Sequence, residues 1–311
     1  MGRFSHSKLE TFKQCPKRYD YNYAQDLNPI EESPNLTVGK LFHGALEALE
    51  NFEDPKPFYD EFAILVRKGL VNGCNEDTLK ITVEEYLRHY NKIDADNETL
   101  YVEEKFEHLT KDSNVISGII DKVYRRHDKV YVQDHKTTLN KLKYSIRDVT
   151  VHGQLNFYSH VLDYDYDMPN DFLEIDEICI HPLNGVELNK DGTPTTDTRK
   201  LAWTTYEDYF DVLQTLGLED DPKYENILKL LKTRGHPLFR RTTVPVNELT
   251  RTNVYNEYIS LADTVENVEP YRVKGPLCDY CPYQEMCYLE LQGGHDVIVD
   301  NMKDSFFKKS E

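Results

Sequence analysis

The sequence predicts a mixed α/β domain with helical additions, because the spacing of its apolar residues changes twice along the chain. Up to about residue 100 the apolar residues recur at helical intervals, between about 100 and 138 they alternate, and mostly helical spacing then returns. The chain has 311 residues, of which 39% are hydrophobic and 30% charged, a composition typical of a soluble globular protein. A chain of this length can bury a sizeable core, so we expect one domain over residues 1–311.

The N-terminal part is expected to be helical. Residues 5–24 predict a helix in which Ser7 and Glu10 fit a capping box, and Pro16 is expected to kink it or to start a second helix after Cys15. Four apolar residues at roughly helical spacing support this segment: Leu9, Phe12, Tyr19 and Tyr23. The stretch NPIEESPN that follows is rich in Pro and Asn and predicts a loop.

Two further helical regions are expected before the alternating part. The stretch TVGKLFHGALEALENF, residues 37–52, predicts a helix with an apolar face made of Leu41, Ala45, Leu46 and Leu49. Residues 56–92 also have helical spacing, with a break at NGCNED.

The alternating part predicts three strands joined by short polar turns. LYVEEKFEHL, VISGIIDKVYRRH and KVYVQDHKT fit an antiparallel meander. A helix is expected next, at about 151–164, and EIDEICIHPL predicts another strand. The following 23 residues, from Asn184 to Tyr206, predict a hairpin or excursion. Helices at about 204–232 and 253–267 are then expected to lead into a cysteine-rich tail.

The charge of the chain bears on its partners. The net charge is −18 and the sequence pI is near 5.1, which argues against broad nonspecific binding to nucleic acid. A localised basic groove, or carboxylates that attract phosphate once a divalent metal is bound, remain compatible with this charge. The sequence has neither an apolar run near the ~20 residues that span a bilayer nor a secretory signal, so a cytoplasmic location without a membrane partner is expected.

Acidic residues lie at the ends of two predicted strands. Asp121 closes SGIID and Asp134 closes VYVQD, and Lys136 points to the same face as Asp134 because the two are i and i+2 on a strand. If the strands pair near these points, a bound Mg²⁺ or Mn²⁺ turns the repulsion between two carboxylates into coordination. The alternative is a surface hairpin with scattered charges.

Two helical features accompany these acids. His43 lies in GKLFHGALEALE, next to hydrophobic positions of the second helix, where a structural role is the alternative. Gln154 and Tyr158 are i and i+4 on the helix after the meander, so they share a face.

The order of GKLFHGALE, GIID, DHKT and QLNFYSHVL resembles the PD-(D/E)XK nuclease superfamily. Within it, the chain is similar to the RecB-type branch, which includes the CRISPR-associated iron–sulfur exonucleases, the AddB nuclease domain and phage-encoded relatives. The resemblance implies a restriction-endonuclease-like core, a mixed central sheet flanked by helices. It also implies hydrolysis of DNA, single-stranded or with free ends, in recombination, repair or phage- or CRISPR-related processing, and in a host cytoplasm if the chain is phage-encoded. Residues 50–100 and 183–250 match no part of this family pattern.

The resemblance implies roles for the residues of these motifs. Asp121 and Asp134 resemble the two metal-binding acids, the backbone carbonyl of His135 a further ligand, and Lys136 the catalytic lysine. His43 resembles a histidine that completes the metal site, which favours Mn²⁺ somewhat over Mg²⁺ because imidazole suits transition metals. Gln154 and Tyr158 resemble the helix motif that positions the lysine and the DNA backbone.

The same resemblance divides the chain into parts. We expect N-terminal helices carrying Cys15 and His43 over 5–50, a helical insertion over 50–100, a nuclease core over 101–182, helical and hairpin additions over 183–270, and a cysteine segment over 271–290. Glu103 or Glu104 is a candidate for a further acidic contact.

The cysteines predict a metal or cluster site. CDYCPYQEMC places Cys278, Cys281 and Cys287 at C-x2-C-x5-C, and Cys15 stands in a Cys-Pro context far away in the sequence. The iron–sulfur branch of the family implies a [4Fe–4S] cluster held by one N-terminal and three C-terminal cysteines, and thiolates suit that cluster. A structural Zn²⁺ site with the same four ligands is the alternative.

Basic residues near the predicted core are candidates for contacts to the nucleic-acid backbone, with ordinary surface charge as the alternative: Arg125, Arg126, Lys141, Lys143, Arg240 and Arg241. Two other functions are compatible with the motifs. One is a non-catalytic iron–sulfur adaptor that binds DNA and a protein partner in a recombination or adaptation complex, and the other is a nuclease that acts on RNA.

Overall fold

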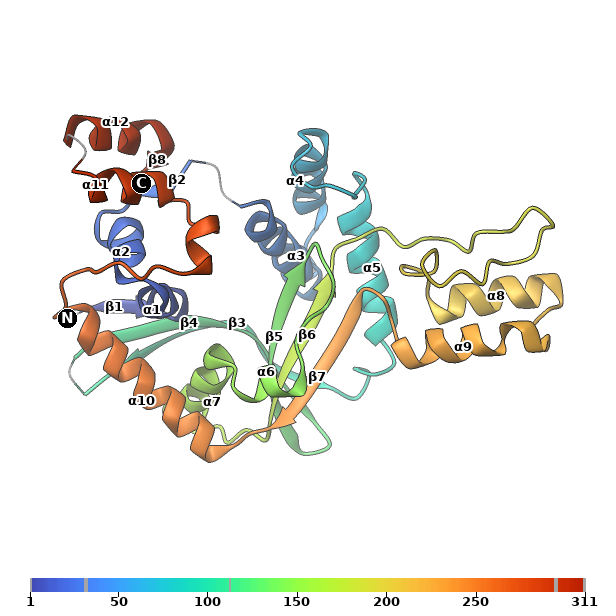
Figure 1. Ribbon diagram of the computed structural model, residues 1–311. Coiled ribbons are helices and arrows are strands. Elements are labelled where there is room, and N and C mark those ends of the chain that lie inside the picture. Colours follow the sequence, from blue (N-terminus) through green and yellow to red (C-terminus); the bar gives the residue numbers. More distant parts are fainter. Residues whose placement is uncertain (1, 31–32, 112, 294–295, 310–311) are drawn as a thin grey trace.

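The protein folds around a six-stranded mixed sheet with helices on both faces, as the computed structural model shows (Figure 1). The structure describes residues 2–30, 33–111, 113–293 and 296–309. The sheet order is β1-β4-β5-β6-β7, and β3 pairs with the other edge of β4. These strands are β1 (Arg3–Ser5), β3 (Glu98–Leu109), β4 (Val115–Arg126), β5 (Lys129–Thr138), β6 (Phe172–Cys179) and β7 (Phe239–Pro245). The predicted mixed α/β class is confirmed.

The predicted meander is confirmed, since β3, β4 and β5 pair antiparallel in sequence order. One edge of β4 is shared by two strands: β1 runs parallel to residues 115–117, and β5 pairs with residues 122–126. The last pair between β4 and β5 is Lys122 with Gln133, so the two strands separate at Asp121 and Asp134, which would pair next. This separation opens the sheet where the sequence places its two acids.

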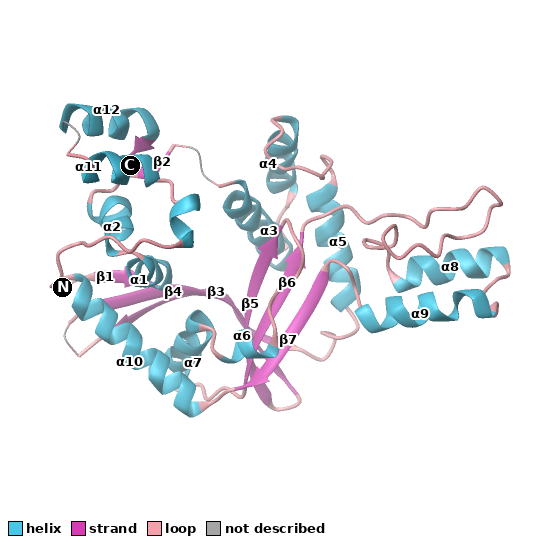
Figure 2. Ribbon diagram, in the orientation of Figure 1, coloured by secondary structure: helices cyan, strands magenta, loops and turns pink. Residues whose placement is uncertain are grey.

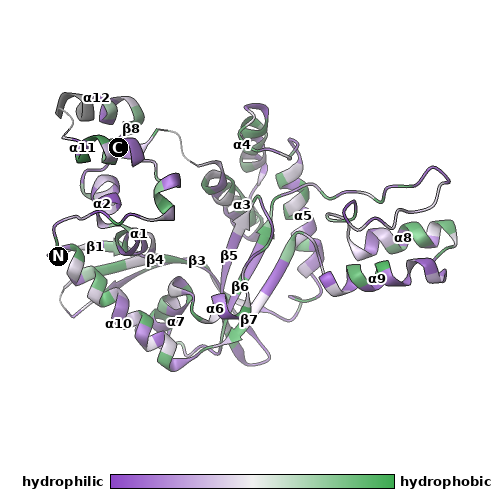
Figure 3. Ribbon diagram, in the orientation of Figure 1, coloured by the Kyte–Doolittle hydropathy of each residue, from purple (hydrophilic) through white to green (hydrophobic). Residues whose placement is uncertain are grey.

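Helices α1 (His6–Gln14), α7 (Gly153–Asp165) and α10 (Glu248–Val265) cover one face of the sheet (Figure 2). Their buried apolar side chains form one core with those of the strands, including Leu9, Phe157, Tyr258 and Ile120. Along α10 hydrophobic and hydrophilic residues alternate (Figure 3), as expected for a helix with one buried side. The short helix α6 (Ile146–Thr150) precedes α7. The expected helix at about 151–164 is confirmed.

Helices α3 (Pro34–Glu50), α4 (Lys56–Arg67) and α5 (Thr78–Tyr90) lie on the opposite face and share a second core. Of the apolar face expected for the second helix, Leu41, Ala45 and Leu46 are buried and Leu49 is partly buried. The predicted break between two helical stretches at NGCNED is also confirmed.

The N-terminal helix differs from the expectation in its cap. The Ser5 side chain, and not that of Ser7, accepts a hydrogen bond from the backbone amide of Lys8, so Ser5 is the N-cap. The expected interruption at Pro16 is confirmed, because α1 ends before Cys15 and α2 (Pro16–Tyr19) starts with Pro16, which lacks an amide proton. A π-helical turn, Asp20–Ala24, follows.

The expected single helix over 204–232 is wrong: it is two helices, α8 (Tyr206–Leu216) and α9 (Pro222–Arg234). Gly217 ends α8 in the left-handed conformation, with φ of 63°, and Pro222 begins α9. The pair has its own small core, including Tyr209, Leu213 and Leu231, and projects away from the sheet (Figure 1). An isolated antiparallel bridge between Leu188 and Pro194 confirms the expected hairpin before it.

The C-terminal part lies against the N-terminal part. After a 3₁₀ turn (Pro276–Tyr280) come α11 (Gln284–Leu291), α12 (Asp296–Phe306) and β8 (Phe307–Lys308), which pairs with β2 (Asn28–Pro29) inside the segment expected to be a loop. The hydroxyl of Tyr283 donates to the carbonyl oxygen of Leu27 at 2.6 Å. None of the described helices is long and apolar enough to cross a membrane.

Candidate active site

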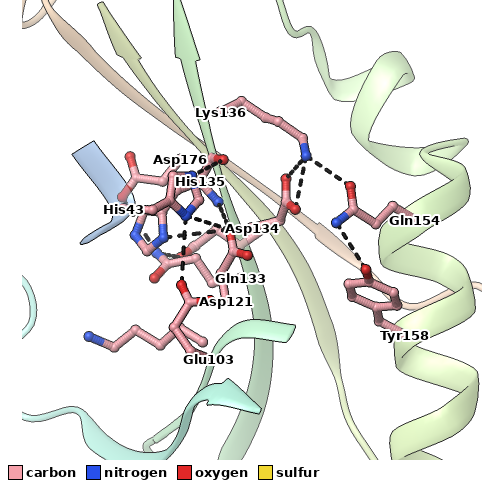
Figure 4. Close-up of polar contacts among 12 residues, drawn as sticks. His43, Glu103, Asp121, Gln133, Asp134, His135, Lys136, Gln154, Tyr158 and Asp176 are labelled. Carbon is pink, nitrogen blue, oxygen red and sulfur yellow. Dashed lines mark hydrogen bonds and ion pairs between the residues drawn. The ribbon is translucent and has the colours of Figure 1, made fainter. Parts of the chain in front are cut away.

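Asp121 and Asp134 lie across from each other where β4 and β5 separate (Figure 4). Because the strands part there, the Asp121 carboxylate turns toward the backbone of β5 and its Oδ2 accepts a hydrogen bond from the amide of His135 at 2.7 Å. Asp134 is 2% exposed, so both carboxylates lie in a largely buried site.

His43 reaches this site from α3. Its Nε2 lies 3.2 Å from the carbonyl oxygen of His135, and its Nδ1 lies 3.7 Å from Oδ2 of Asp121. Nδ1 of His135 lies 3.8 Å from the same Asp121 oxygen. Among the described residues, His43, Asp121 and His135 are the one group whose three ligand atoms all lie within 4.8 Å of one another. The structure thus brings the imidazole of His135 close to the acids as well as its carbonyl.

Glu103 adds a third carboxylate on the other side of Asp121. It lies between the pairs Val102–Lys122 and Glu104–Ile120, which puts it opposite Asp121 on β3. Its φ of 49° is left-handed, which is uncommon for a residue with a side chain and interrupts the strand there. Its Oε1 lies 3.7 Å from Nδ1 of His43. Of the two glutamates considered from the sequence, Glu103 therefore faces the site.

Lys136 lies on the other side of Asp134. Its Nζ is 2.7 Å from Oδ2 of Asp134 and donates a hydrogen bond of 2.8 Å to Oε1 of Gln154 (Figure 4). Nε2 of Gln154 in turn donates to the hydroxyl of Tyr158 at 3.2 Å, so both residues face the lysine from α7. A Cβ at Gly118 of β4 would lie 2.8 Å from that hydroxyl, so glycine leaves the space in which Tyr158 fits.

The charges of the site are strongly coupled. Burial and the nearby Asp134 carboxylate raise the pKa of Asp121 to about 7. Burial works against the charged form of His43, but the nearby carboxylates of Glu103 and Asp121 outweigh burial and raise its pKa to about 9. Burial also opposes the charge of Lys136, whose pKa is nevertheless raised by Asp134 and Asp121.

This donor set fits a divalent cation. Carboxylates, a backbone carbonyl and one or two imidazoles converge within a few ångströms, and such ligands suit Mg²⁺ and Mn²⁺. The Asp134 carboxylate is already paired with the Lys136 ammonium, 2.7 Å from Oδ2, so the fit to a metal rests on the chemistry of these donors and on their closeness.

A cavity of about 480 Å³ lies beside the lysine, lined by α1, α10 and the start of α7. His6 and His152 lie in its wall, and the pKa of each is lowered, first by burial and also by the charge of Lys136. The pKa of His6 falls to about 4, and its ring accepts or donates a hydrogen bond with the Tyr258 hydroxyl. Sequence reasoning did not single out either histidine, because neither lies in a motif of the strands.

A buried polar network supports His135 from the opposite face. Nε2 of His135 lies 3.1 Å from the hydroxyl of Tyr86, which donates to Oδ2 of Asp176 at 2.7 Å. Arg241 binds Asp176 through two nitrogens, at 2.9 and 2.7 Å, and also binds Asp94. Tyr86 comes from α5, so the region expected to be a helical insertion contributes a side chain that contacts His135.

Most of the basic residues that are candidates for nucleic-acid contacts interact with other side chains of this chain. Arg241, a candidate for such a contact in the sequence, is largely buried and pairs with Asp94 and Asp176 in the network above. Arg240 binds Glu177 at 2.6 Å and Arg125 binds Glu98 at 2.7 Å. Arg126 packs over the ring of Tyr131, 4.7 Å from its centre. Lys141 and Lys143 are exposed and stay candidates.

Three of the four cysteines expected to hold a cluster, Cys15, Cys278 and Cys281, are close enough to affect one another, and Cys287 packs against the same apolar cluster as Cys281. Burial raises the pKa of the half-buried Cys281 thiol, and the neighbouring Cys15 and Cys278 raise it further. Nε of Arg272 donates to Sγ of Cys287 at 3.2 Å. In the part of the chain that the structure describes, these sulfurs do not form a ligand group as tight as that of His43 and Asp121. Cys179 is fully buried, as expected for a small apolar residue.

Comparison with models of known protein families shows a match to one family. The model of the PD-(D/E)XK nuclease superfamily matches residues 3–288. No curated protein sequence matches the chain. Among solved structures, the crystal structure of SSO0001 is similar, with 12% sequence identity and a TM-score of 0.34 over 92% of this chain and 86% of that chain.

Proposed function

Because this chain belongs to the PD-(D/E)XK nuclease superfamily, we propose that it is a divalent-metal-dependent DNA exonuclease whose catalytic residues are Asp121, Asp134 and Lys136. One observation carries this assignment: Nζ of Lys136 lies 2.7 Å from the buried Asp134, opposite Asp121, at the point where two strands separate. A surface hairpin with scattered charges has no reason to bury these three groups together.

The residues divide the work of phosphodiester hydrolysis. Mg²⁺ or Mn²⁺, when bound, polarises the scissile phosphate and acidifies the attacking water. Asp121, Asp134, His43 and the carbonyl of His135 would hold that ion. Lys136 keeps its charge in this acidic site, orients the water and offsets negative charge that develops on the phosphate. Gln154, positioned by Tyr158, holds the ammonium in place.

The test compares wild type, Lys136→Ala and the control Lys229→Ala, an exposed lysine on α9. Each is incubated with DNA labelled at either end, single- or double-stranded, and with RNA of the same sequence, in Mg²⁺, Mn²⁺ or EDTA. We expect DNA to be degraded from an end by wild type and control with metal, and a loss of rate of at least ~10²-fold in Lys136→Ala. Folded wild type that cleaves nothing with either metal would favour the adaptor instead. Faster degradation of RNA than of DNA would contradict the assignment of DNA as the substrate. Products of internal cleavage would contradict the exonuclease assignment.

We also propose that Cys15, Cys278, Cys281 and Cys287 hold a [4Fe–4S] cluster. The packing of Cys281 and Cys287 with Tyr21 and Leu27 supports this, because it brings the cysteine segment beside the N-terminal segment that follows Cys15. Four thiolates suit such a cluster, and it would join the two chain ends where Tyr283 already contacts Leu27. A zinc ion with the same ligands is the alternative.

Iron, sulfide and zinc contents of anaerobically purified protein separate these two possibilities. We expect iron and sulfide with broad visible absorbance. Cys281→Ser is expected to remove the iron and sulfide, together with the visible absorbance, and to lower the melting temperature. The control Cys74→Ser alters a thiol that lies near a backbone carbonyl outside the cysteine segment, and it should keep the cluster. Colourless protein with one zinc ion per chain would contradict the cluster.

A further inference from the structure

A basic groove of about 1130 Å³ lies between the N-terminal helices, the start of α3 and the cysteine segment. Its wall includes Arg18, Lys40, Lys308 and Lys309, together with Tyr280 and Tyr283. These residues come from distant parts of the sequence. They meet because β8 pairs with β2 and because Tyr283 packs against Tyr21 of the N-terminal segment.

The charge of this groove differs from that of the whole chain. The net charge of the chain is −18, yet the described residues that line the groove include four cations and no carboxylate. No ion pair joins Arg18, Lys308 or Lys309 to an acidic side chain of the described residues, in contrast to Arg125, Arg240 and Arg241. Cations on a concave surface that have no acidic partner among the described residues attract ligands of the opposite sign. The groove therefore favours a polyanion.

An exposed aromatic ring lies at the same place. Tyr280 is 87% exposed, so its ring is open to solvent beside these cations. Next to it, Tyr283 is buried and stacks on Phe307 with ring centres 5.1 Å apart, which fixes that wall of the groove. A rigid wall with a free ring beside cations is the arrangement on which unpaired bases stack while phosphates contact the cations.

The groove adjoins the candidate active site through α3. Lys40 lines the groove, and His43 lies three residues further along the same helix, a rise of about 4.5 Å. A strand that lies in the groove would therefore have phosphates within reach of the site formed by His43 and Asp121. Paired bases would have no face free for the Tyr280 ring, so a single strand fits better than a duplex.

We propose that this basic groove binds the backbone of a single DNA strand and leads it to the metal site, with Tyr280 stacking on an unpaired base. The proposal rests on the proposed nuclease function and names its substrate as single-stranded. It also assigns nucleic-acid contacts, Arg18, Lys40, Lys308 and Lys309, that differ from those expected from the sequence.

Fluorescence anisotropy of a labelled single-stranded DNA in EDTA tests the groove without cleavage. The variants are Lys308→Glu with Lys309→Glu, and separately Tyr280→Ala. The control, Lys229→Glu with Lys232→Glu, makes the same change of charge on exposed positions of α9. We expect the first variant to bind at least about 10-fold more weakly, with a salt dependence of log K that is shallower by roughly 1.4, since each lost phosphate contact removes about 0.7. Tyr280→Ala should bind about 5- to 150-fold more weakly at unchanged salt dependence. The control should bind as wild type.

The outcomes separate the groove from the nuclease. If the groove variants, with unchanged melting temperature, bind single-stranded DNA as wild type does, the groove is refuted, whether or not the protein cleaves. If the control loses as much affinity as the groove variant, the effect is one of net charge and the proposal fails. Duplex DNA that binds as tightly as a single strand would refute the stacking of an unpaired base. Binding that depends on the groove, in a protein that never cleaves with metal, would keep the groove and reject the nuclease.

Discussion

Asp121 shows how one residue couples the fold to the site. It is the point at which β4 loses β5 as a partner, and its carboxylate accepts the amide hydrogen bond that β5 would otherwise make within the ladder. The sheet buries the Asp121 carboxylate, whereas metal binding requires that carboxylate to be ionised. Without a bound cation, the ionised form is therefore costly.

This conflict predicts how stability depends on pH in protein without metal. The folded-state pKa of Asp121, about 7, lies above its ordinary value near 4, so the group stabilises the fold fully only below pH ~4, and this contribution is lost as the pH rises to about 7. In EDTA, the melting temperature of Asp121→Asn relative to wild type should therefore rise between pH 4 and 7. Scanning fluorimetry measures it. A difference that stays constant over this range would contradict the raised pKa, and Mn²⁺ should stabilise wild type far more than the variant.

For single residues, the sequence predicts which side chains share a face within one strand or helix. It does not predict contacts between residues that are distant in the sequence. Asp134 and Lys136 share a face of one strand, and Gln154 and Tyr158 share a face of one helix, so periodicity alone relates them. Glu103 reaches His43 only because its backbone adopts a left-handed conformation, which no alternation predicts.

At the scale of elements, α5 is more than an insertion that covers the sheet. Its Tyr86 connects His135 with Asp176, and Arg241 of β7 neutralises that aspartate. Two elements outside the meander therefore fix the backbone that carries the carbonyl beside His43.

Removing one hydroxyl tests this connection. Tyr86→Phe removes a donor to the buried Asp176 carboxylate and the oxygen that faces Nε2 of the buried His135, so we expect the free energy of unfolding to fall by about 1–3 kcal/mol. Urea denaturation measures this change, and calorimetric titration with Mn²⁺ should show weaker binding. Tyr164→Phe, at a position 67% exposed, is the control and should change neither. An unchanged Mn²⁺ affinity in Tyr86→Phe would mean that the network only stabilises the fold.

Helices with a clear apolar face could be predicted from the sequence. Strands that form only because a neighbouring strand pairs with them could not. The face of α3 is visible as Leu41, Ala45 and Leu46, whereas β7 has the polar sequence FRRTTVP and is a strand because β6 pairs with it. Arg240 and Arg241 in that strand look like surface charges in the sequence, yet the acids of β6 bind both.

At the scale of the whole molecule, α8 and α9 form a projection with a core of its own, separate from the two cores of the sheet. Because neither helix contributes to the candidate site, replacing residues 186–234 by a short Gly/Ser linker should leave metal binding and cleavage within about 10-fold of wild type, at some loss of thermal stability. End-labelled DNA cleavage measures this. A folded replacement variant that binds Mn²⁺ but no longer degrades DNA would assign the projection to substrate binding.

The way in which the two ends of the chain pack together was the hardest feature to predict from the sequence. The sequence suggested that Cys15 belongs with the three C-terminal cysteines, but only through resemblance to a family. The pairing of Asn28 with Lys308 has no local signal, because two-residue strands carry no periodicity.

That pairing sets an order of events during synthesis. The residues of the candidate metal and lysine site all precede residue 159, so they are present once about half of the chain has been made. The groove cannot close until Lys308 has been added to the growing chain, because one wall of it is made by β8. At roughly 5–20 residues per second, about 150 residues take on the order of ten seconds. During that interval the nascent chain carries the residues of its proposed hydrolytic site without the groove that we propose to bring a strand to them.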